Sequence, residues 1–241
     1  MSTALTVEEY VARQGRYAWR RRLLRGLIRS VGFRMLAKVN VIGLENVPVE
    51  GSTILMMSHV SLIDPVVCMG VVTSRFVIPM TKIENAQSPV FGVLVRAWGA
   101  YTVRRGEVDR SALMNSIELL KSGQIVLIAP EGTRNPDGLT MPKDGMTYIA
   151  TKADAVIVPT AMAGGQDYLD RWKRLQRTES TVAFGKPFRF KTLSTRRIPR
   201  DVLAQMTQEA MYQLAIVQPD IALRGMYSDV ENATTEYLDF V

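Results

Sequence analysis

From Val39 onward the sequence alternates short β-rich runs with longer segments of helical periodicity. Such alternation is typical of α/β domains with a parallel central sheet. The run at positions 125–129, Ile-Val-Leu-Ile-Ala, is apolar throughout, as expected of a strand that is covered on both faces. We therefore expect an α/β fold in which helices flank a mainly parallel central sheet.

The pattern also predicts the individual elements and the limits of the domain. The expected strands are 39–42, 53–57, 75–78, 101–104, 124–129, 155–160 and 181–184. The expected helices are 62–72, 88–98, 109–121, 145–152 and 200–218. A chain of 241 residues suits one such domain. We assign it to residues 39–218, between an N-terminal segment, 1–38, and a C-terminal tail, 219–241.

Positive charge is concentrated near the N-terminus. Nine of the 30 basic residues lie between positions 10 and 38, where there is no Asp or Glu, and the rest of the chain has 21 basic and 23 acidic residues. Apolar residues recur there at helical spacing, which predicts a basic amphipathic helix. Such a helix could pack on the domain, lie on an anionic membrane or bind nucleic acid. Without a stacking platform we expect no nucleic-acid partner, and we assign residues 10–38 to an anionic membrane surface.

Other features bear on location and metal content. The longest run without a charged residue, 51–63, has 13 residues, and a membrane-spanning helix needs roughly 20. The first residues do not follow the signal-peptide pattern, and a single cysteine, Cys68, permits no internal disulfide. We expect a peripheral protein on the cytoplasmic side of the cell membrane. One histidine and one cysteine are too few for the usual zinc or haem ligands, so we expect no metal.

The only histidine, His59, directly follows the expected strand 53–57 and Ser58. In α/β folds functional groups gather outside the carboxyl ends of strands. Asp64 can orient the imidazole if His59 lies in the turn before the next helix, and Pro65 suits the first turn of that helix. Two alternatives remain open here: a structural role for the histidine, and Asp64 as the N-cap of the helix.

A second polar segment follows the apolar run 125–129. Residues 130–138 are rich in Gly, Pro and Asn and are consistent with an ordinary turn. They also include Glu131 and Arg134, which is more charge than a connecting turn requires.

Four blocks, in this order, resemble those of the glycerolipid acyltransferase family, of the 1-acylglycerol-3-phosphate acyltransferase type. The blocks are His59-x4-Asp64, residues 99–104, residues 130–134 (Pro-Glu-Gly-Thr-Arg) and residues 158–159 (Val-Pro). Two departures are visible: Ser58 stands where many members have Asn, and Tyr-Thr-Val at 101–103 differs from the usual second block. They bear on the acceptor more than on the reaction type.

The resemblance implies an O-acyltransferase that uses acyl-CoA or acyl-carrier protein as co-substrate and requires no cofactor. The implied acceptor is a lysophospholipid, above all 1-acylglycerol 3-phosphate, which would give phosphatidic acid. His59 would be the general base, and Asp64 would fix its tautomer. The implied substrate-binding residues are Lys82, Arg104, Glu131, Gly132, Thr133 and Arg134.

Among the implied binding residues, the three cations Lys82, Arg104 and Arg134 would bind the acceptor's phosphate. Glu131 would hold basic groups in place, and Gly132 would let the backbone approach the substrate. Other functions stay open: acylation of glycerol 3-phosphate or of a lysophospholipid with a larger headgroup, hydrolysis of the acyl thioester, and non-catalytic binding of lipid or nucleic acid.

Overall fold

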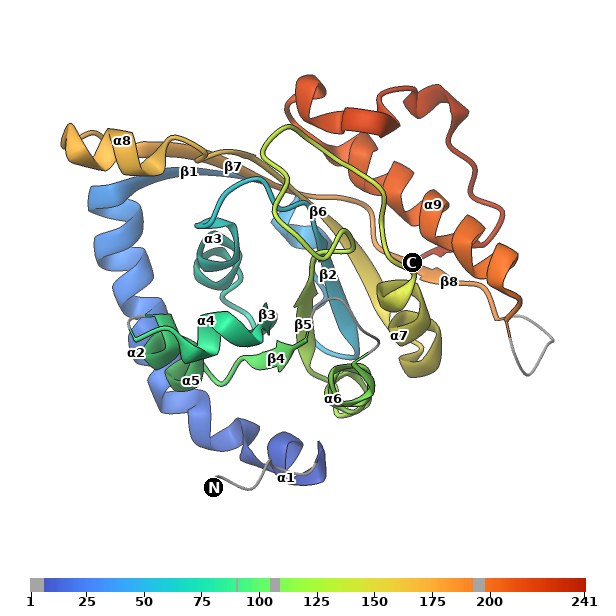
Figure 1. The fold of residues 1–241 in the computed structure, drawn as a ribbon, viewed down its shortest axis with the longest axis horizontal. Coiled ribbons are helices and arrows are strands. Elements are labelled where there is room, and N and C mark those ends of the chain that lie inside the picture. The colour runs from blue at the N-terminus through green and yellow to red at the C-terminus, as the bar shows by residue number, and fades with distance from the viewer. Residues whose placement is uncertain (1–6, 90, 105–108, 193–197) are drawn as a thin grey trace.

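The computed structural model describes residues 7–89, 91–104, 109–192 and 198–241. Nine strands of this described part form one sheet through the molecule (Figure 1). Its main path has the order β1-β7-β6-β2-β5-β3-β4, while β8 pairs with β6 and β9 with β8. The strands are β1 (Ala37–Ile42), β2 (Thr53–Met57), β3 (Val77–Lys82), β4 (Tyr101–Val103), β5 (Ile125–Ile128), β6 (Val156–Gly164), β7 (Thr178–Phe184), β8 (Phe188–Phe190) and β9 (Leu238–Phe240).

Most neighbouring strands are parallel, which confirms the expected α/β fold. β6, β2, β5, β3 and β4 run in one direction, whereas β7 is antiparallel to β6 and β1 is parallel to β7. The carboxyl ends of β6, β2, β5, β3 and β4 therefore lie at one edge of the sheet, where β1 and β7 begin. We refer to this edge as the carboxyl edge.

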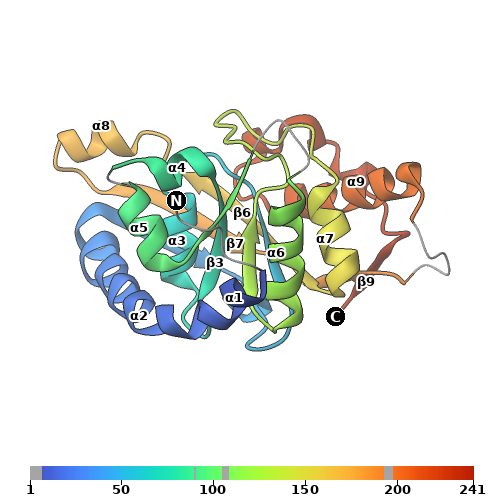
Figure 2. The same cartoon turned by 60° about the horizontal axis from the view of Figure 1, so that its bottom comes forward.

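Helices cover both faces of the sheet (Figure 2). The α-helices are α1 (Val7–Ala12), α2 (Ala18–Leu27), α3 (Asp64–Val71), α4 (Ile83–Gln87), α5 (Phe91–Trp98), α6 (Arg110–Lys121), α7 (Gly145–Ala153), α8 (Tyr168–Lys173) and α9 (Arg200–Val217). The other helical segments are η1 (Arg13–Tyr17), the π-helix η2 (Ile28–Leu36), η3 (Leu44–Asn46), η4 (Ile221–Tyr227) and η5 (Val230–Asn232).

The side chains of β2 contribute to two hydrophobic clusters. Ile54 and Met56 belong to the cluster with residues of α6, α7 and α9, whereas Leu55 and Met57 belong to the cluster with residues of α3. Successive side chains of a strand point to opposite faces of the sheet. A strand covered on both faces must therefore be apolar at every position, which explains the continuous apolar runs in the sequence.

Several elements differ from the expectation. β3 begins at Val77, which pairs with Ile125 at the start of β5, and it continues to Lys82 along β4. The preceding Arg75 lies outside the strand and donates to the backbone carbonyls of Pro48, Gly51 and Gly123. The expected helix 88–98 corresponds to α5, with the short α4 before it, and position 90 lies outside the described residues. α8, β8 and β9 were not expected from the sequence pattern.

The N-terminal basic segment forms α1, η1, α2 and η2. α1 packs on α6, whereas α2 and η2 pack along the outside of α5 and α3 (Figure 1). Glycines allow close approach: Gly99, at φ +75, lies against the ring of Tyr17, and Gly70 lies against Phe33. Within the segment Arg21 is 2% exposed. Its guanidinium donates to carbonyl oxygens at the end of α5, and burial lowers the pKa of Arg21 to about 10. Positions 1–6 lie outside the described residues.

The same segment exposes a second apolar face. We had expected one apolar face made of Tyr17, Leu24, Leu27, Ile28, Val31 and Met35. The structure divides this set: Tyr17, Leu24 and Ile28 are half-buried, whereas Leu27, Val31 and Met35 are exposed. A separate row of exposed apolar side chains, four residues apart, runs along α2 and η2; this apolar stripe consists of Trp19, Leu23, Leu27, Val31 and Met35. In the described part of the chain, no helix combines the length and the apolarity needed to cross a membrane.

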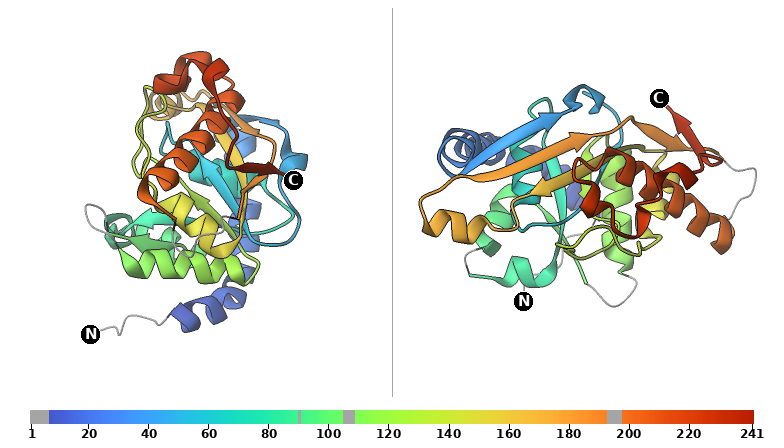
Figure 3. Two further views of the ribbon diagram at one scale, coloured as in Figure 1. Left: turned by 90° about the vertical axis from the view of Figure 1, so that its right-hand side faces the viewer. Right: turned by 90° about the horizontal axis from the view of Figure 1, so that it is seen from above.

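Residues 219–241, expected as a tail, pack against α9 and the edge of the sheet (Figure 3). The buried carboxylate of Glu209 in α9 accepts hydrogen bonds from Thr234 and from two backbone N–H groups of the segment. Tyr227 and Leu238 are buried. Buried apolar side chains and one buried carboxylate thus hold in place a stretch that we had expected to be a tail.

Candidate active site

His59 lies in the turn between β2 and α3, at the carboxyl edge of the sheet. Its Nδ1 is 3.0 Å from Oδ2 of Asp64, the first residue of α3. The imidazole is 16% exposed, and its Nε2 has no hydrogen-bond partner among the described residues. The ring is thus held by one nitrogen and presents the other, as a general base requires.

The carboxylate of Asp64 is buried and binds the turn that precedes α3. Its Oδ2 also accepts hydrogen bonds from the backbone N–H groups of Val60, at 2.8 Å, and Ser61, at 2.7 Å. The alternative that Asp64 caps the helix is wrong, because α3 begins at Asp64 and the amides it binds come before it. Burial raises the pKa of Asp64, and the hydrogen bonds from His59 and the two amides oppose this shift.

Two buried serines attach the His59 turn to β6. The backbone N–H of Ser58 donates to Thr160, and Ser58 Oγ accepts a hydrogen bond from the N–H of Met162 at 2.8 Å. Ser61 Oγ donates to the carbonyl of Gly165 at 2.5 Å. Both hydroxyls are therefore bound to backbone. Ser58, which stands where many members of the resembled family have Asn, therefore supports this turn through its bonds to β6.

The loop that follows β5 is joined to the His59 turn, since the N–H of Asn135 donates to the His59 carbonyl at 2.8 Å. Glu131 lies at the start of this loop and is 4% exposed. Its Oε1 accepts hydrogen bonds from Asn135 Nδ2 at 2.7 Å, from the N–H of Thr140 at 2.6 Å and from Thr140 Oγ1 at 2.9 Å. We had expected Glu131 to hold basic groups; instead it folds the loop back on itself. Asn135 was not predicted as a functional residue.

The three cations expected to bind phosphate all stand at the carboxyl edge. Lys82 is the last residue of β3, and Arg104 follows β4, the strand paired with β3. Arg134 lies in the loop after β5, the other neighbour of β3. The Arg134 side chain is exposed and has no hydrogen-bond or ion-pair partner among the described residues. It is therefore available to an anionic ligand.

Gly132 and Thr133 complete the expected set. Gly132 has φ +70, a conformation that favours glycine. A Cβ at Gly132 would lie 3.4 Å from Lys143 Nζ, so the Lys143 ammonium lies over this block. It adds a cation that was not among the expected binding residues. Thr133 is exposed on the same turn.

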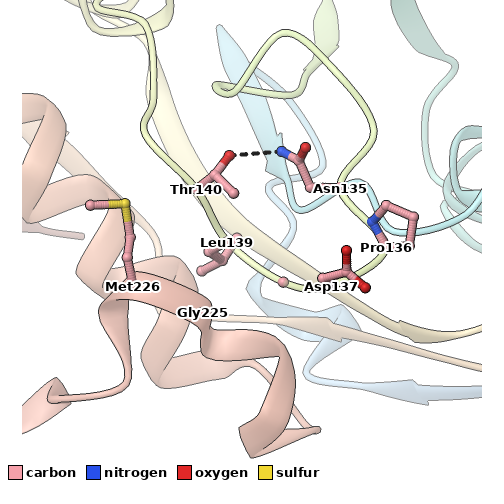
Figure 4. A pocket seen from close by; sticks show the side chains of 8 residues that line it. Asn135, Pro136, Asp137, Leu139, Thr140, Gly225 and Met226 are labelled. Carbon is pink, nitrogen blue, oxygen red and sulfur yellow. Dashed lines mark hydrogen bonds between the residues drawn. The ribbon is translucent and has the colours of Figure 1, made fainter.

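A pocket opens beside this site, where the loop meets η4 (Figure 4). It is lined by residues 135–140 together with Gly225 and Met226. Two backbone hydrogen bonds join Leu139 to η4. His59 does not line this pocket, so the pocket is a neighbour of the His59–Asp64 pair and not the place where the pair would act.

Comparison with known proteins decides the family. Residues 38–163 match the model of the family described as Acyltransferase. The chain belongs to the acyltransferase family. The matched range contains His59, Asp64 and the Pro-Glu-Gly-Thr-Arg block at 130–134, so the family assignment agrees with the resemblance that these blocks carry.

Curated 1-acyl-sn-glycerol-3-phosphate acyltransferases are among its relatives. That of Borreliella burgdorferi is 29% identical over 128 residues, which cover 52% of this chain and 51% of the relative. That of Bacillus subtilis is 31% identical over 137 residues, covering 56% and 68%. The matched part of the chain thus spans about half the length of the first relative.

A solved structure supports the fold. The crystal structure of the 1-acyl-sn-glycerophosphate acyltransferase of Thermotoga maritima matches with a TM-score of 0.64 and 22% identity. The match covers 85% of this chain and 81% of the other. Acyltransferase family membership and this fold together place the His59 turn in a known architecture.

Proposed function

We propose that this acyltransferase-family chain transfers a fatty acyl group from an acyl thioester to the free hydroxyl of 1-acylglycerol 3-phosphate, forming phosphatidic acid. The observation that carries the proposal is the His59–Asp64 pair, with Nδ1 and Oδ2 at 3.0 Å and Nε2 without a partner among the described residues. The names of the relatives from Borreliella burgdorferi and Bacillus subtilis support the same reaction.

In the proposed step, His59 Nε2 removes the proton of the acceptor hydroxyl while its oxygen attacks the thioester carbonyl carbon. A C–O bond forms, the C–S bond breaks, and the proton passes from the imidazolium to the leaving thiolate sulfur. The carboxylate of Asp64 holds the ring by Nδ1 and stabilises the transient imidazolium. A thiolate is a good leaving group, so the step includes no covalent acyl-enzyme, and the donor is acyl-CoA or acyl-carrier protein.

The acceptor's phosphate would bind at the carboxyl edge. Arg134 can offer a bidentate pair of donors to phosphate oxygens, and its loop is bound to the His59 carbonyl through Asn135. Lys82 and Arg104 add fixed positive charge from the neighbouring strands. This arrangement supports an anionic acceptor whose hydroxyl reaches Nε2 of His59.

The apolar stripe on α2 and η2 supports a membrane location for the reaction. Five exposed arginines without a hydrogen bond or ion pair among the described residues accompany it: Arg13, Arg16, Arg20, Arg22 and Arg34. Arg29 is also exposed but donates to the carbonyl of Gly70. Each basic residue near an anionic leaflet contributes about 1 kcal/mol, which would total about 5 kcal/mol for the five arginines. We propose that residues 10–38 lie on the anionic cytoplasmic leaflet, where the lysophospholipid acceptor resides.

The proposal is tested by product identification. The purified chain is incubated with acyl-CoA or acyl-carrier protein and with 1-acylglycerol 3-phosphate, glycerol 3-phosphate or lysophosphatidylinositol. We expect phosphatidic acid and free thiol in equal amounts, and only when the acceptor is present. His59→Ala should lower transfer by roughly 10²–10⁴-fold with an unchanged melting temperature. Val49→Ala, in the loop before β2 at the opposite edge of the sheet, is the control.

Three results would contradict the proposal. Full turnover in His59→Ala would exclude the imidazole as base. Thiol release that does not depend on the acceptor would indicate a thioesterase. A product formed only from glycerol 3-phosphate or only from lysophosphatidylinositol would reassign the acceptor.

A further inference from the structure

The turn between β6 and β7, residues 166–177, contains α8 and lies at the carboxyl edge; we refer to it as the α8 turn. It begins directly after Gly165, whose carbonyl accepts the hydrogen bond from Ser61 in the His59 turn at 2.5 Å. It is followed directly by Thr178, where β7 starts. The α8 turn is therefore attached to the backbone that holds the proposed catalytic pair.

The α8 turn exposes apolar side chains. Leu175 is 97% exposed and Leu169 is 53% exposed. Leu175 also adopts φ +56, a left-handed conformation that is unfavourable for a leucine. Single exposed leucines are common on protein surfaces. The left-handed backbone at this position closes α8, because the N–H groups of Leu175 and Gln176 donate to the carbonyls of Trp172 and Arg171. Glycine or asparagine would serve this cap with less strain, and a leucine side chain that stays 97% exposed adds almost no burial within the described fold.

The charge of the α8 turn is complementary to an anionic surface. It has four basic residues, Arg171, Lys173, Arg174 and Arg177, against the two acidic residues Asp167 and Asp170, a difference of +2. Arg171 and Lys173 form ion pairs within the turn. The Arg174 side chain, next to Leu175, has no such partner among the described residues. Charge and exposed leucine thus lie side by side.

The α8 turn is also joined to the apolar stripe. Trp172 Nε1 donates to the carbonyl of Leu36 at 2.9 Å, and Arg177 donates to the carbonyls of Phe33 and Ala37 at 2.7 and 3.0 Å. Figure 1 shows α8 next to the start of β1, where η2 ends. These contacts connect α8 to the last turn of the segment that we place on the membrane.

We propose that the α8 turn is a second lipid-docking element, which inserts Leu175 and Leu169 among the headgroups of an anionic bilayer. The inference deepens the proposed function and rests on it for the identity of the acceptor. With the stripe on α2 and η2, the α8 turn makes a two-part contact that places the bilayer surface next to the His59 turn. A lysophospholipid could then reach Nε2 without leaving the bilayer surface completely.

The test substitutes Leu175 by asparagine, which tolerates the left-handed conformation. Partitioning of the full chain onto phosphatidylglycerol–phosphatidylcholine vesicles is measured by co-sedimentation. We expect Leu175→Asn to bind roughly tenfold more weakly, as suits the loss of one partly inserted leucine, while its melting temperature is unchanged or higher. The matched control is Val49→Asn, a 73% exposed apolar residue before β2, which should bind like wild type.

Activity separates this inference from the proposed function. Leu175→Asn should lower acyl transfer to vesicle-embedded 1-acylglycerol 3-phosphate but not to a short-chain, water-soluble analogue. If Leu175→Asn binds vesicles as well as the wild type, the inference is overturned. It is also overturned if Leu175→Asn keeps vesicle binding but loses self-association or carrier-protein binding, because the leucine would then serve a protein contact. If the wild-type chain makes no phosphatidic acid and yet Leu175→Asn binds vesicles weakly, the proposed function fails and lipid docking stands.

Discussion

Glu131 offers a quantitative test of how the loop after β5 is held. Its Oε1 accepts three hydrogen bonds from Asn135 and Thr140. Hydrogen bonds to a charged group contribute about 1.5–3 kcal/mol and neutral ones about 0.5–1.5 kcal/mol. Glu131→Gln keeps the accepting oxygen and should weaken each bond by roughly 1 kcal/mol. Because Thr140 is exposed and Asn135 is half-buried, we expect a total of about 1–2 kcal/mol for Glu131→Gln and about 3 kcal/mol for Glu131→Ala.

The same loop contains Arg134 and binds the His59 carbonyl, so loosening it should weaken acceptor binding. If substrate binding must restore the lost order, kcat/KM for the acceptor should fall roughly tenfold in Glu131→Gln and roughly a hundredfold in Glu131→Ala. Most of this change should appear in KM, and the pH profile of kcat should not move, because Glu131 is a positioning residue.

The assay combines steady-state kinetics over a range of acceptor concentrations with chemical unfolding of each variant. A result in which Glu131→Gln loses kcat as completely as Glu131→Ala, at unchanged stability, would refute this reasoning. It would show that the carboxylate itself takes part in proton transfer. Wild-type kinetics and stability in Glu131→Ala would equally refute it, since the three hydrogen bonds would then contribute nothing.

Two further predictions concern Asp64 and the apolar stripe. Burial raises the pKa of Asp64 in the folded state. The protonated carboxyl therefore contributes stability that is fully present below the unfolded-state pKa of about 4. This contribution is lost between about pH 4 and the raised pKa of the folded state. In urea titrations, the free energy of unfolding of the wild type, compared with that of Asp64→Asn, should therefore decrease as the pH rises through this range. An increase would contradict the raised pKa. Replacing both Leu23 and Leu27 by serine should reduce vesicle binding, and added salt should weaken the binding of the wild type. Binding unaffected by the substitutions would exclude the stripe, and binding unaffected by salt would exclude the arginines.

Much of the fold followed from local pattern. A strand covered on both faces must be apolar throughout, and β2 and β5 lie within two such runs. The helices α6, α7 and α9 were predicted close to their observed limits because each buries one periodic face. β3 was misplaced because its limits follow its pairing with β5 and β4, and no local pattern reports which strands will be neighbours.

The site was also predictable in part. His59 and Asp64 are close in sequence, so a single turn suffices to bring them together, and their spacing could be interpreted directly. The role of Glu131 could not be predicted from the sequence, because an acidic residue near an arginine in the sequence suggests an ion pair. Its partners depend on how the loop folds back, and Thr140 is nine positions away.

Local periodicity and short motifs were enough to specify the layered α/β architecture, the acyltransferase blocks and the excess of positive charge near the N-terminus. Long-range packing alone fixes which faces of α2 and η2 are buried, that the acidic C-terminal segment packs on α9, and that α8 adjoins the end of η2. These features depend on which strands are neighbours. The parallel strand order brings the ends of distant segments to one edge, and this long-range pairing leaves no local signal in the chain.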